Sequence, residues 1–172
     1  LMKILSGAYR PDPGGEIRIE GKPVRIDGPL GGRAAGISII YQELSLAPNL
    51  SVAENIYLGR EISHSGLLAR GAMRIGVGPI LERLGAELDP DAAAASLTTV
   101  QQRLLMIARG LASDARLLVL DEPSASLTSD EIELLHVVLR RIAGQGTAVV
   151  YVSHRLDEIV SLTERVMVMR NG

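Results

Sequence analysis

Residues 117–123, Leu-Leu-Val-Leu-Asp-Glu-Pro, are the stretch that decides the fold of this 172-residue chain. Four consecutive apolar residues followed by two carboxylates predict a buried parallel strand that delivers acidic groups to its carboxyl end. Open α/β sheets bind their ligands beyond the carboxyl ends of the strands. Asp121 is therefore expected to hold a magnesium ion, directly or through water. Glu122 is expected to polarise a water molecule for attack on a phosphate. Taken alone, the motif also fits a strand and turn with a purely structural role.

Two further apolar segments also end in polar residues. Gln42 follows the segment Gly36–Ile40, and His154 follows the segment Thr147–Val152. A single glutamine or histidine after a strand is more often structural than catalytic. Here the carboxyl ends of parallel strands would meet at one edge of a sheet, together with the acidic pair described above. The shared position of all these side chains therefore favours a single site.

With these motifs in this order, the chain resembles the ATP-binding subunits of ABC transporters over essentially its whole length. Gln42 matches the Q-loop glutamine of that family, Leu117–Glu122 its Walker B strand with the catalytic glutamate, and His154 its switch histidine. Residues Ala125–Thr128 fall at the D-loop, where Ser126 would bridge two modules. The resemblance implies an α/β fold, with a mainly parallel sheet of the P-loop NTPase type and an inserted helical subdomain.

Three segments narrow the resemblance to the sugar (monosaccharide) import branch, and within it to the first of its two ATPase modules. They are Tyr41–Leu44, Ala53–Glu61 and Tyr151–Ile159. The resemblance implies a transport-coupled ATPase with ATP and Mg²⁺ as cofactors. The implied partners are a second ABC module, in the same polypeptide or as a dimer mate, and transmembrane permease subunits. A periplasmic or extracellular sugar-binding protein would act indirectly, and the protein would lie peripherally on the cytoplasmic face of the bacterial inner (plasma) membrane.

The phosphate loop that such an ATPase needs, Gly-x-x-x-x-Gly-Lys-Ser/Thr, does not occur in the 172 residues. Gly14-Gly15 and Gly31-Gly32-Arg33 lack its spacing and its lysine, so they predict turns. Leu1–Gly7 predicts part of a helix that ends at the glycine. In the family this helix directly follows the phosphate loop. The chain is therefore expected to begin just after the residues that grip ATP, and by itself to be inactive.

The family signature segment, usually Leu-Ser-Gly-Gly-Gln, corresponds here to Leu97-Thr-Thr-Val-Gln101. Thr98 keeps a hydroxyl group, and either Thr98 or Thr99 can cap the helix that follows. Val100 stands where a glycine would let the backbone approach a phosphate, and its branched side chain opposes that approach. The resemblance implies that residues 98–101 face a nucleotide held by the opposite module. Because of Val100, it stays open whether residues 98–101 support hydrolysis of the nucleotide held by the opposite module.

The composition excludes several classes of protein. A net charge of −2 and a pI near 5.9 give no basic footprint for nucleic acid, so no nucleic-acid partner is expected. The absence of cysteine excludes disulfides and thiol chemistry. No apolar run in the sequence approaches the roughly 18 residues that span a bilayer, so membrane association is expected through partners.

The length predicts one domain, in which three regions are distinguished. Residues 1–44 are expected to form part of the core and a small β region with a hairpin over Glu16–Val24. Residues 45–112 are expected to be helical throughout, with one or two helices over Leu67–Leu84 and the signature helix at the end. Residues 113–172 are expected to complete the core with the Walker B strand and the switch histidine.

Capping boxes and apolar periodicity predict two helix starts and two buried helix faces. Ser51 with Glu54 and Thr128 with Glu131 have capping-box spacing, and the second pair opens a helix expected over residues 129–143. His64 and His136 are expected to be solvated or to pack structurally. The residues expected on the buried faces are Leu104, Leu105, Ile107, Ala108 and Leu111 in the signature helix, and Ile132, Leu135, Val138, Leu139 and Ile142 in the next.

The resemblance also implies a mechanism, in which two modules close around ATP. Glu122 would act as general base or would orient the attacking water, and Asp121 would organise magnesium. Gln42 would sense the metal and the water, and His154 would contact the γ-phosphate and hold Glu122 in register. Two alternatives stay open: a catalytically inactive ABC module with a structural or regulatory role at the dimer interface, and a soluble ABC ATPase of DNA repair or translation. The lack of basic stripes disfavours the latter.

Overall fold

A computed structural model of the protein describes residues 1–43 and 45–170 of the chain. Leu44, the last residue of the predicted Tyr41–Leu44 segment and of the first region, lies outside the described residues. Residues 171 and 172, at the end of the third region, also lie outside them. No helix in the described ranges is long and apolar enough to cross a membrane.

The central sheet has three parallel strands, β3 (Ile37–Ile40), β6 (Leu117–Asp121) and β7 (Ala148–Val152), in the order β3-β6-β7. All three are the strands predicted from the sequence. The decisive strand β6 lies in the middle, so its apolar run is covered on both faces, as parallel strands require. Strand β7 at the edge is more exposed than the sequence suggested, since its residues are partly buried or exposed and none is fully buried.

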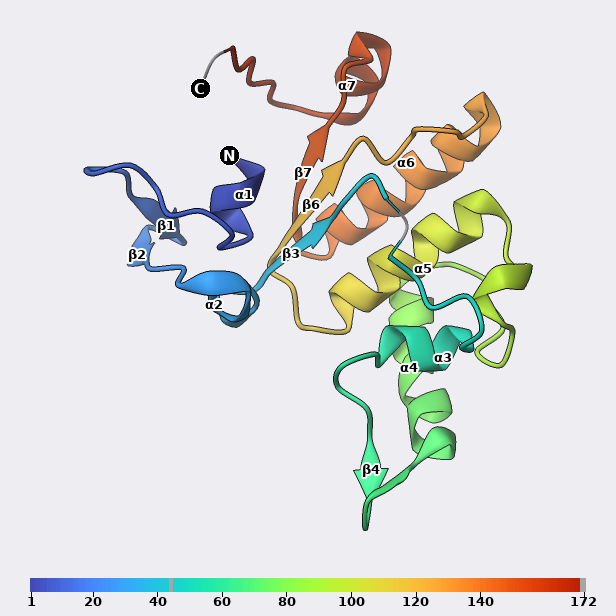
Figure 1. The fold of residues 1–172 in the computed structure, drawn as a ribbon. Helices are drawn as coiled ribbons and strands as arrows, with labels where there is room; N and C mark the ends of the chain where they lie inside the picture. The colour runs from blue at the N-terminus through green and yellow to red at the C-terminus, as the bar shows by residue number, and fades with distance from the viewer. Residues whose placement is uncertain (44, 171–172) are drawn as a thin grey trace.

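Successive residues of β6 contribute to two different cores, because side chains alternate between the faces of a sheet. Leu118 and Leu120 join the larger cluster on the side of the long helices. Val119 joins a smaller cluster with Ile26 and Ile37, on the side of the N-terminal elements. Figure 1 shows the two layers, with α5 and α6 on one side of the sheet and α1, α2 and the first hairpin on the other.

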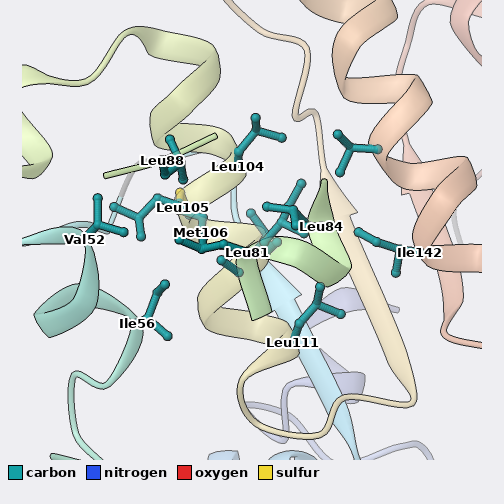
Figure 2. Packing of buried hydrophobic residues seen from close by; sticks show 14 of the residues in the cluster. Val52, Ile56, Leu81, Leu84, Leu88, Leu104, Leu105, Met106, Leu111 and Ile142 are labelled. Carbon is teal, nitrogen blue, oxygen red and sulfur yellow. The ribbon is translucent and has the colours of Figure 1, made fainter. Parts of the chain in front are cut away.

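The larger core is formed chiefly by α5 (Thr99–Leu111) and α6 (Ser129–Gly144), which pack against the sheet and each other. The predicted apolar faces of both helices are buried, which confirms their periodicity. Figure 2 shows these side chains meeting those of α3 (Val52–Ile56) and α4 (Arg70–Leu84). The labelled members of this cluster are Val52, Ile56, Leu81, Leu84, Leu88, Leu104, Leu105, Met106, Leu111 and Ile142.

Three capping boxes fix where the helices begin. The side chains of Ser51, Thr98 and Thr128 accept bonds from the backbone of α3, α5 and α6 respectively. In each case the residue at the third helical position bonds back to the backbone of the cap. The helix predicted over residues 129–143 is thus confirmed and runs one residue further.

The N-terminal elements are α1 (Met2–Leu5) and the predicted hairpin of β1 (Ile17–Ile19) and β2 (Lys22–Val24). Glu20 and Gly21 connect the strands, both with positive φ, as a tight hairpin turn of the primed type requires.

One prediction in this region was wrong, because Gly31-Gly32-Arg33 lies within helix α2 (Gly28–Ala34) and not in a turn. Pro29 in its first turn favours a helix start, and Gly32 lets α2 pack closely: a Cβ there would lie 3.1 Å from the Leu5 carbonyl oxygen.

The region 45–112 is not helical throughout, which corrects a second prediction. Two short strands, β4 (Ser63–His64) and β5 (Leu67–Leu68), form a hairpin around a Ser65-Gly66 turn whose residues both have positive φ. After the hairpin α4 forms one continuous helix, although the sequence suggested that its glycines and Pro79 would loosen it. The short helix η1 (Ala94–Ser96) then precedes α5. Helix α7 (Leu156–Leu162) follows β7 near the end of the chain.

A glycine of α4 has a packing role. A Cβ at Gly76 would lie 2.3 Å from the hydroxyl oxygen of Tyr57, which follows α3. Glycine leaves room for the tyrosine hydroxyl in this position, so the residue that looked like a helix breaker is part of the contact between α3 and α4.

Candidate functional site

The site is built where β6 and β7 end side by side. Asp121 is the last residue of β6 and pairs in register with Val152, the last residue of β7. The backbone N–H of Glu122 donates to the Val152 carbonyl at 2.9 Å, which continues the pairing one residue beyond the strand. The acidic pair and the residues after β7 are thus held at one edge of the sheet.

Glu122 has a φ of 45°, in the left-handed region that residues other than glycine rarely adopt. Such a conformation costs on the order of 1–3 kcal/mol and is common at functional sites. It ends the strand abruptly and begins the turn that contains Ser126. Within that turn, the Ala125 N–H donates to the Glu122 carbonyl at 3.2 Å and the Leu127 N–H to the Ser124 carbonyl at 3.1 Å.

Glu122 and His154 are in direct contact. Oε1 of Glu122 lies 3.0 Å from Nδ1 of His154. A carboxylate only accepts hydrogen bonds, so an ionised Glu122 requires the proton of the imidazole to be on Nδ1. The other ring nitrogen, Nε2, then becomes an acceptor available to a ligand. The His154 side chain is 74% exposed and that of Glu122 34%, so a substrate can reach both.

Asp121 meets the chemical requirements of a magnesium ligand. Its carboxylate makes no hydrogen bond or ion pair with the residues that the structure describes, so no protein cation neutralises it. Magnesium typically binds through one or two protein carboxylates together with phosphate oxygens of the substrate. In the described parts of the chain, no three acidic, histidine or cysteine side chains gather into a metal cluster. The donor set therefore fits a metal ion shared with a phosphate.

Gln42 is exposed, two residues beyond β3, and helix α5 holds the segment around it. Arg103 donates from Nη1 to the Gln42 carbonyl at 2.8 Å. Arg109 donates to both the carbonyl and the hydroxyl oxygen of Ser45, at 2.8 and 2.9 Å. Both arginines are on α5, and burial lowers the pKa of each. Among the described residues, no hydrogen bond joins the Gln42 side chain to Glu122 or His154, so the structure brings together only part of the predicted set.

Residues 98–101 form the start of α5. Thr98 is the cap, as predicted: its hydroxyl accepts from the Gln101 N–H at 3.4 Å and the Gln101 side chain bonds back at 3.0 Å. Thr99 is exposed, but Val100 is buried, because it shares one helix face with Leu104. The side chain expected to oppose a phosphate therefore packs inward. No hydrogen bond in the described parts links residues 98–101 to Glu122 or His154.

Ser126 is exposed and has a φ of 71°, so the turn after Glu122 contains a second strained residue. Among the described residues, the two histidines expected to be structural make no hydrogen bond to Glu122 or His154. His64 is exposed on β4, and His136 is buried on α6, with its ring edge-on to Tyr151 at 5.7 Å.

Sequence reasoning missed Glu158, a buried carboxylate in the first turn of α7. Its Oε2 accepts hydrogen bonds from the hydroxyls of Ser124, Tyr151 and Ser153 at 2.7, 2.8 and 3.2 Å. Burial and the bond to this carboxylate raise the pKa of Tyr151 well above its usual value, and the Ser124 hydroxyl partly offsets this. An acidic residue early in a helix usually lies in solvent, so no local pattern signals that this one is buried.

Comparisons with known proteins relate the chain to one family. The sequence profile described as ABC transporter matches residues 1–125. The ribose import ATP-binding protein RbsA 2 of Burkholderia pseudomallei (strain 1710b) is 51% identical over 176 residues, which cover 100% of this chain and 34% of that protein. RbsA 2 of Escherichia coli O157:H7 is 46% identical with the same coverage of each protein. The chain thus spans about a third of the length of the curated relatives it matches.

Solved structures show the same fold at low sequence identity. The ATP-binding cassette MJ1267 of an ABC transporter, in its ADP conformation, has a TM-score of 0.78 at 20% identity over 94% of this chain and 67% of that one. The cbiO1 protein of Clostridium perfringens, part of the ABC transporter complex cbiONQ, has a TM-score of 0.73 at 23% identity over 92% and 62%. These likenesses confirm the predicted fold class.

Proposed function

Because the chain belongs to the ABC transporter family, we propose that it is part of an ATP-binding subunit that hydrolyses ATP to power the import of a sugar. The observation that carries the proposal is the Glu122–His154 pair at the carboxyl ends of β6 and β7. This edge of an α/β sheet is where nucleotides and their phosphates bind. The pair supplies a carboxylate and an imidazole at the position where a water molecule would attack.

Hydrolysis of ATP requires a water oxygen to bond to the γ-phosphorus while the bond from that phosphorus to the ADP oxygen breaks. Such transfers depend mainly on positioning and on electrostatic stabilisation. In the proposed mechanism, Glu122 orients the water and accepts its proton. His154 holds Glu122 through Nδ1. Its Nε2 would donate a hydrogen bond to the γ-phosphate only when the imidazole carries a proton on both nitrogens.

Asp121 and Gln42 are the proposed magnesium ligands. Asp121 contributes a carboxylate that no described side chain neutralises, and Gln42 contributes an amide oxygen from the neighbouring strand end. Magnesium, when bound with the nucleotide, would neutralise the negative charge of the phosphates. The contacts of Arg103 and Arg109 with the Gln42 segment tie this ligand to α5, so a movement of the helix would also move Gln42.

We propose that residues 98–101 and Ser126 face a nucleotide held by a second ABC module. The capping box of α5 occupies the N–H groups of Thr98 and Gln101, and the remaining N–H groups of this helix N-terminus, on Thr99 and Val100, would favour an anion. Val100 does not obstruct this surface with its side chain, because that side chain packs into the core. The left-handed conformation of Ser126 places an exposed hydroxyl in the turn next to Glu122.

The sugar-import part of the proposal is supported by the names of the relatives, which are ribose import ATP-binding proteins. The proposed partners are a second ABC module, transmembrane permease subunits and, indirectly, a sugar-binding protein. The proposed location is the cytoplasmic face of the bacterial inner membrane. Within the chain, residues 1–44 and 113–172 would form the nucleotide-binding core. Residues 45–112 would contact the permease.

The two alternatives explain the structure less well. A catalytically inactive interface module has no physical need for a strained glutamate that is hydrogen-bonded to a histidine at a strand edge. An ATPase of DNA repair or translation is disfavoured by the net charge of −2 and by the import proteins among the relatives. The chain spans about a third of the length of its curated relatives, so the proposed activity is that of the whole protein.

Reconstitution tests the proposal. The intact protein is placed in vesicles with its permease and its sugar-binding protein. Phosphate release and uptake of a panel of labelled monosaccharides, including ribose, are measured with Mg-ATP supplied on the cytoplasmic side. We expect both signals, and both should be lost in Asp121→Asn. Hydrolysis without uptake of any sugar would contradict the import function, and absence of hydrolysis would contradict the enzymatic one.

A further inference from the structure

Glu158 is a carboxylate inside the protein, with only 3% of its surface exposed. A buried carboxylate is unfavourable unless hydrogen bonds or an opposite charge compensate it. Here the hydroxyls of Ser124, Tyr151 and Ser153 all donate to Oε2. Oε1 lies 2.9 Å from Nη1 of Arg155 and forms an ion pair with it, but this contact does not have the geometry of a hydrogen bond. The three hydroxyls and the guanidinium surround the buried carboxyl group, so it is held as an acceptor at a fixed point of the fold.

The donors come from the segments that carry the proposed catalytic pair. Ser124 lies two residues after Glu122, in the turn beyond β6. Ser153 and Arg155 are the two immediate neighbours of His154 beyond β7. The Glu158 carboxylate therefore connects the turn that carries Glu122 to the residues on both sides of His154.

We propose that Glu158 is a positioning residue for ATP hydrolysis, which fixes the loop of His154 against the turn of Glu122 so that their side chains stay at hydrogen-bond distance. This inference rests on the proposed function. Glu158 is buried, so it acts through Glu122 and His154 and not on the nucleotide. The His154 side chain is largely exposed and lies outside β7, so its place depends on its hydrogen bond to Glu122 and on how its two chain neighbours are held. Small misplacements of reacting groups are known to reduce rates strongly.

The first experiment measures steady-state ATP hydrolysis by the intact protein. Glu158→Ala should lower kcat by about 10- to 100-fold with little change in KM for ATP, because orientation is lost while nucleotide contacts remain. Glu158→Gln keeps the size and much of the hydrogen bonding, so it should lose less. Asp157→Asn is the matched control. Asp157 lies in the same helical turn as Glu158 and is exposed, and its carboxylate is 3.4 Å from the Arg155 guanidinium. Unchanged kcat in Glu158→Ala would overturn the inference.

A second experiment separates positioning from a merely structural role. If Glu158 acts through His154, then Glu158→Ala should have little further effect on kcat in a His154→Ala background. A residue that only stabilises α7 would lower kcat by the same factor in both backgrounds, and that result would overturn the inference.

Circular dichroism and thermal unfolding check that each variant is folded. Should Glu158→Ala fail to fold, Ser124→Ala and Ser153→Ala replace it, because each removes one donor and leaves the carboxylate in place.

A third readout does not depend on hydrolysis. The ring resonances of His154 are observed by NMR of histidine-labelled protein and assigned by their loss in His154→Ala. Glu158→Ala should shift these resonances and Asp157→Asn should not. Unshifted His154 resonances in Glu158→Ala would overturn the inference whether or not ATP is hydrolysed. If the wild-type protein does not hydrolyse ATP, the proposed function fails, and the NMR result still decides the position of His154.

Discussion

Nδ1 of His154 lies 3.0 Å from Oε1 of Glu122, although the two residues are 32 positions apart in the chain. The contact exists because β6 and β7 are parallel neighbours in register, so that Asp121 and Val152 end at the same level of the sheet. Each residue by itself would be an ordinary polar group after a strand. Together they form an acceptor and an imidazole at the edge of the sheet where phosphates bind.

The role of His154 can be tested by removing its imidazole. His154→Ala should lower kcat for ATP hydrolysis by about 10- to 100-fold, because Glu122 loses the contact that orients it. ATP binding should change much less. His64→Ala is the control, since His64 is exposed on the β4–β5 hairpin and belongs to no part of the site. Phosphate release measured over a range of ATP concentrations gives kcat and KM separately. Equal rates for His154→Ala and the wild type would remove His154 from the mechanism.

The buried His136 should make stability depend on pH. Burial lowers the pKa of His136; the nearby Glu158 and Glu133 raise it, and Arg140 lowers it further. The unfolded chain therefore binds a proton more readily than the folded one as the pH falls below the usual histidine value, near 6.5, so stability declines in this range. His136→Leu should flatten this decline.

Urea unfolding of the wild type and of His136→Leu between pH 8 and pH 5 measures the effect. A variant at the exposed His64 controls for the loss of a histidine in general. A decline as steep in His136→Leu as in the wild type would show that other groups cause it.

Packing of α6 against the sheet can be tested with two leucines of the same helix. Leu139 is 1% exposed and Leu134 is 47% exposed. Leu139→Ala should lower the free energy of unfolding by about 2–5 kcal/mol, because it leaves a cavity in the larger core. Leu134→Ala removes the same atoms from the surface and should have a far smaller effect. Denaturant unfolding followed by circular dichroism compares the two, and equal losses would contradict the described packing.

The cap of α5 can be tested with two adjacent threonines. Thr98→Ala removes the hydroxyl that accepts from the Gln101 N–H and should cost about 1 kcal/mol of stability. Thr99→Ala changes the next residue, which lies inside the helix and supplies no cap, so it should be nearly neutral. Thermal unfolding of both variants is the measurement. A larger loss for Thr99→Ala would place the helix start one residue later.

The sequence predicted the parts of the fold that depend on local patterns. The structure confirms three features that depend on residues close together in the sequence. They are the apolar run 117–120, the capping boxes and the apolar helix faces. Polar residues after three apolar strands also predicted which side chains would share an edge. That His154 holds Glu122 was implied only by the family resemblance; in the structure the two side chains meet because β6 and β7 are adjacent.

What the sequence could not predict depends on contacts between distant residues. Gly76 breaks a helical pattern locally, but in the fold it makes room for Tyr57. The β4–β5 hairpin is too short to show an alternating pattern. The burial of Val100 depends on its helix face, and that of Glu158 on three hydroxyl donors spread over two segments. No single stretch of sequence shows these contacts.

The most direct test of the proposed mechanism is Glu122→Gln in the intact protein. The amide keeps the size of the side chain and can still accept a hydrogen bond from His154, but it cannot take a proton from water. ATP binding measured by calorimetry should remain close to that of the wild type, while hydrolysis measured by phosphate release should fall by at least about 100-fold. Hydrolysis at the wild-type rate would show that Glu122 is not the catalytic group and would contradict the proposed mechanism.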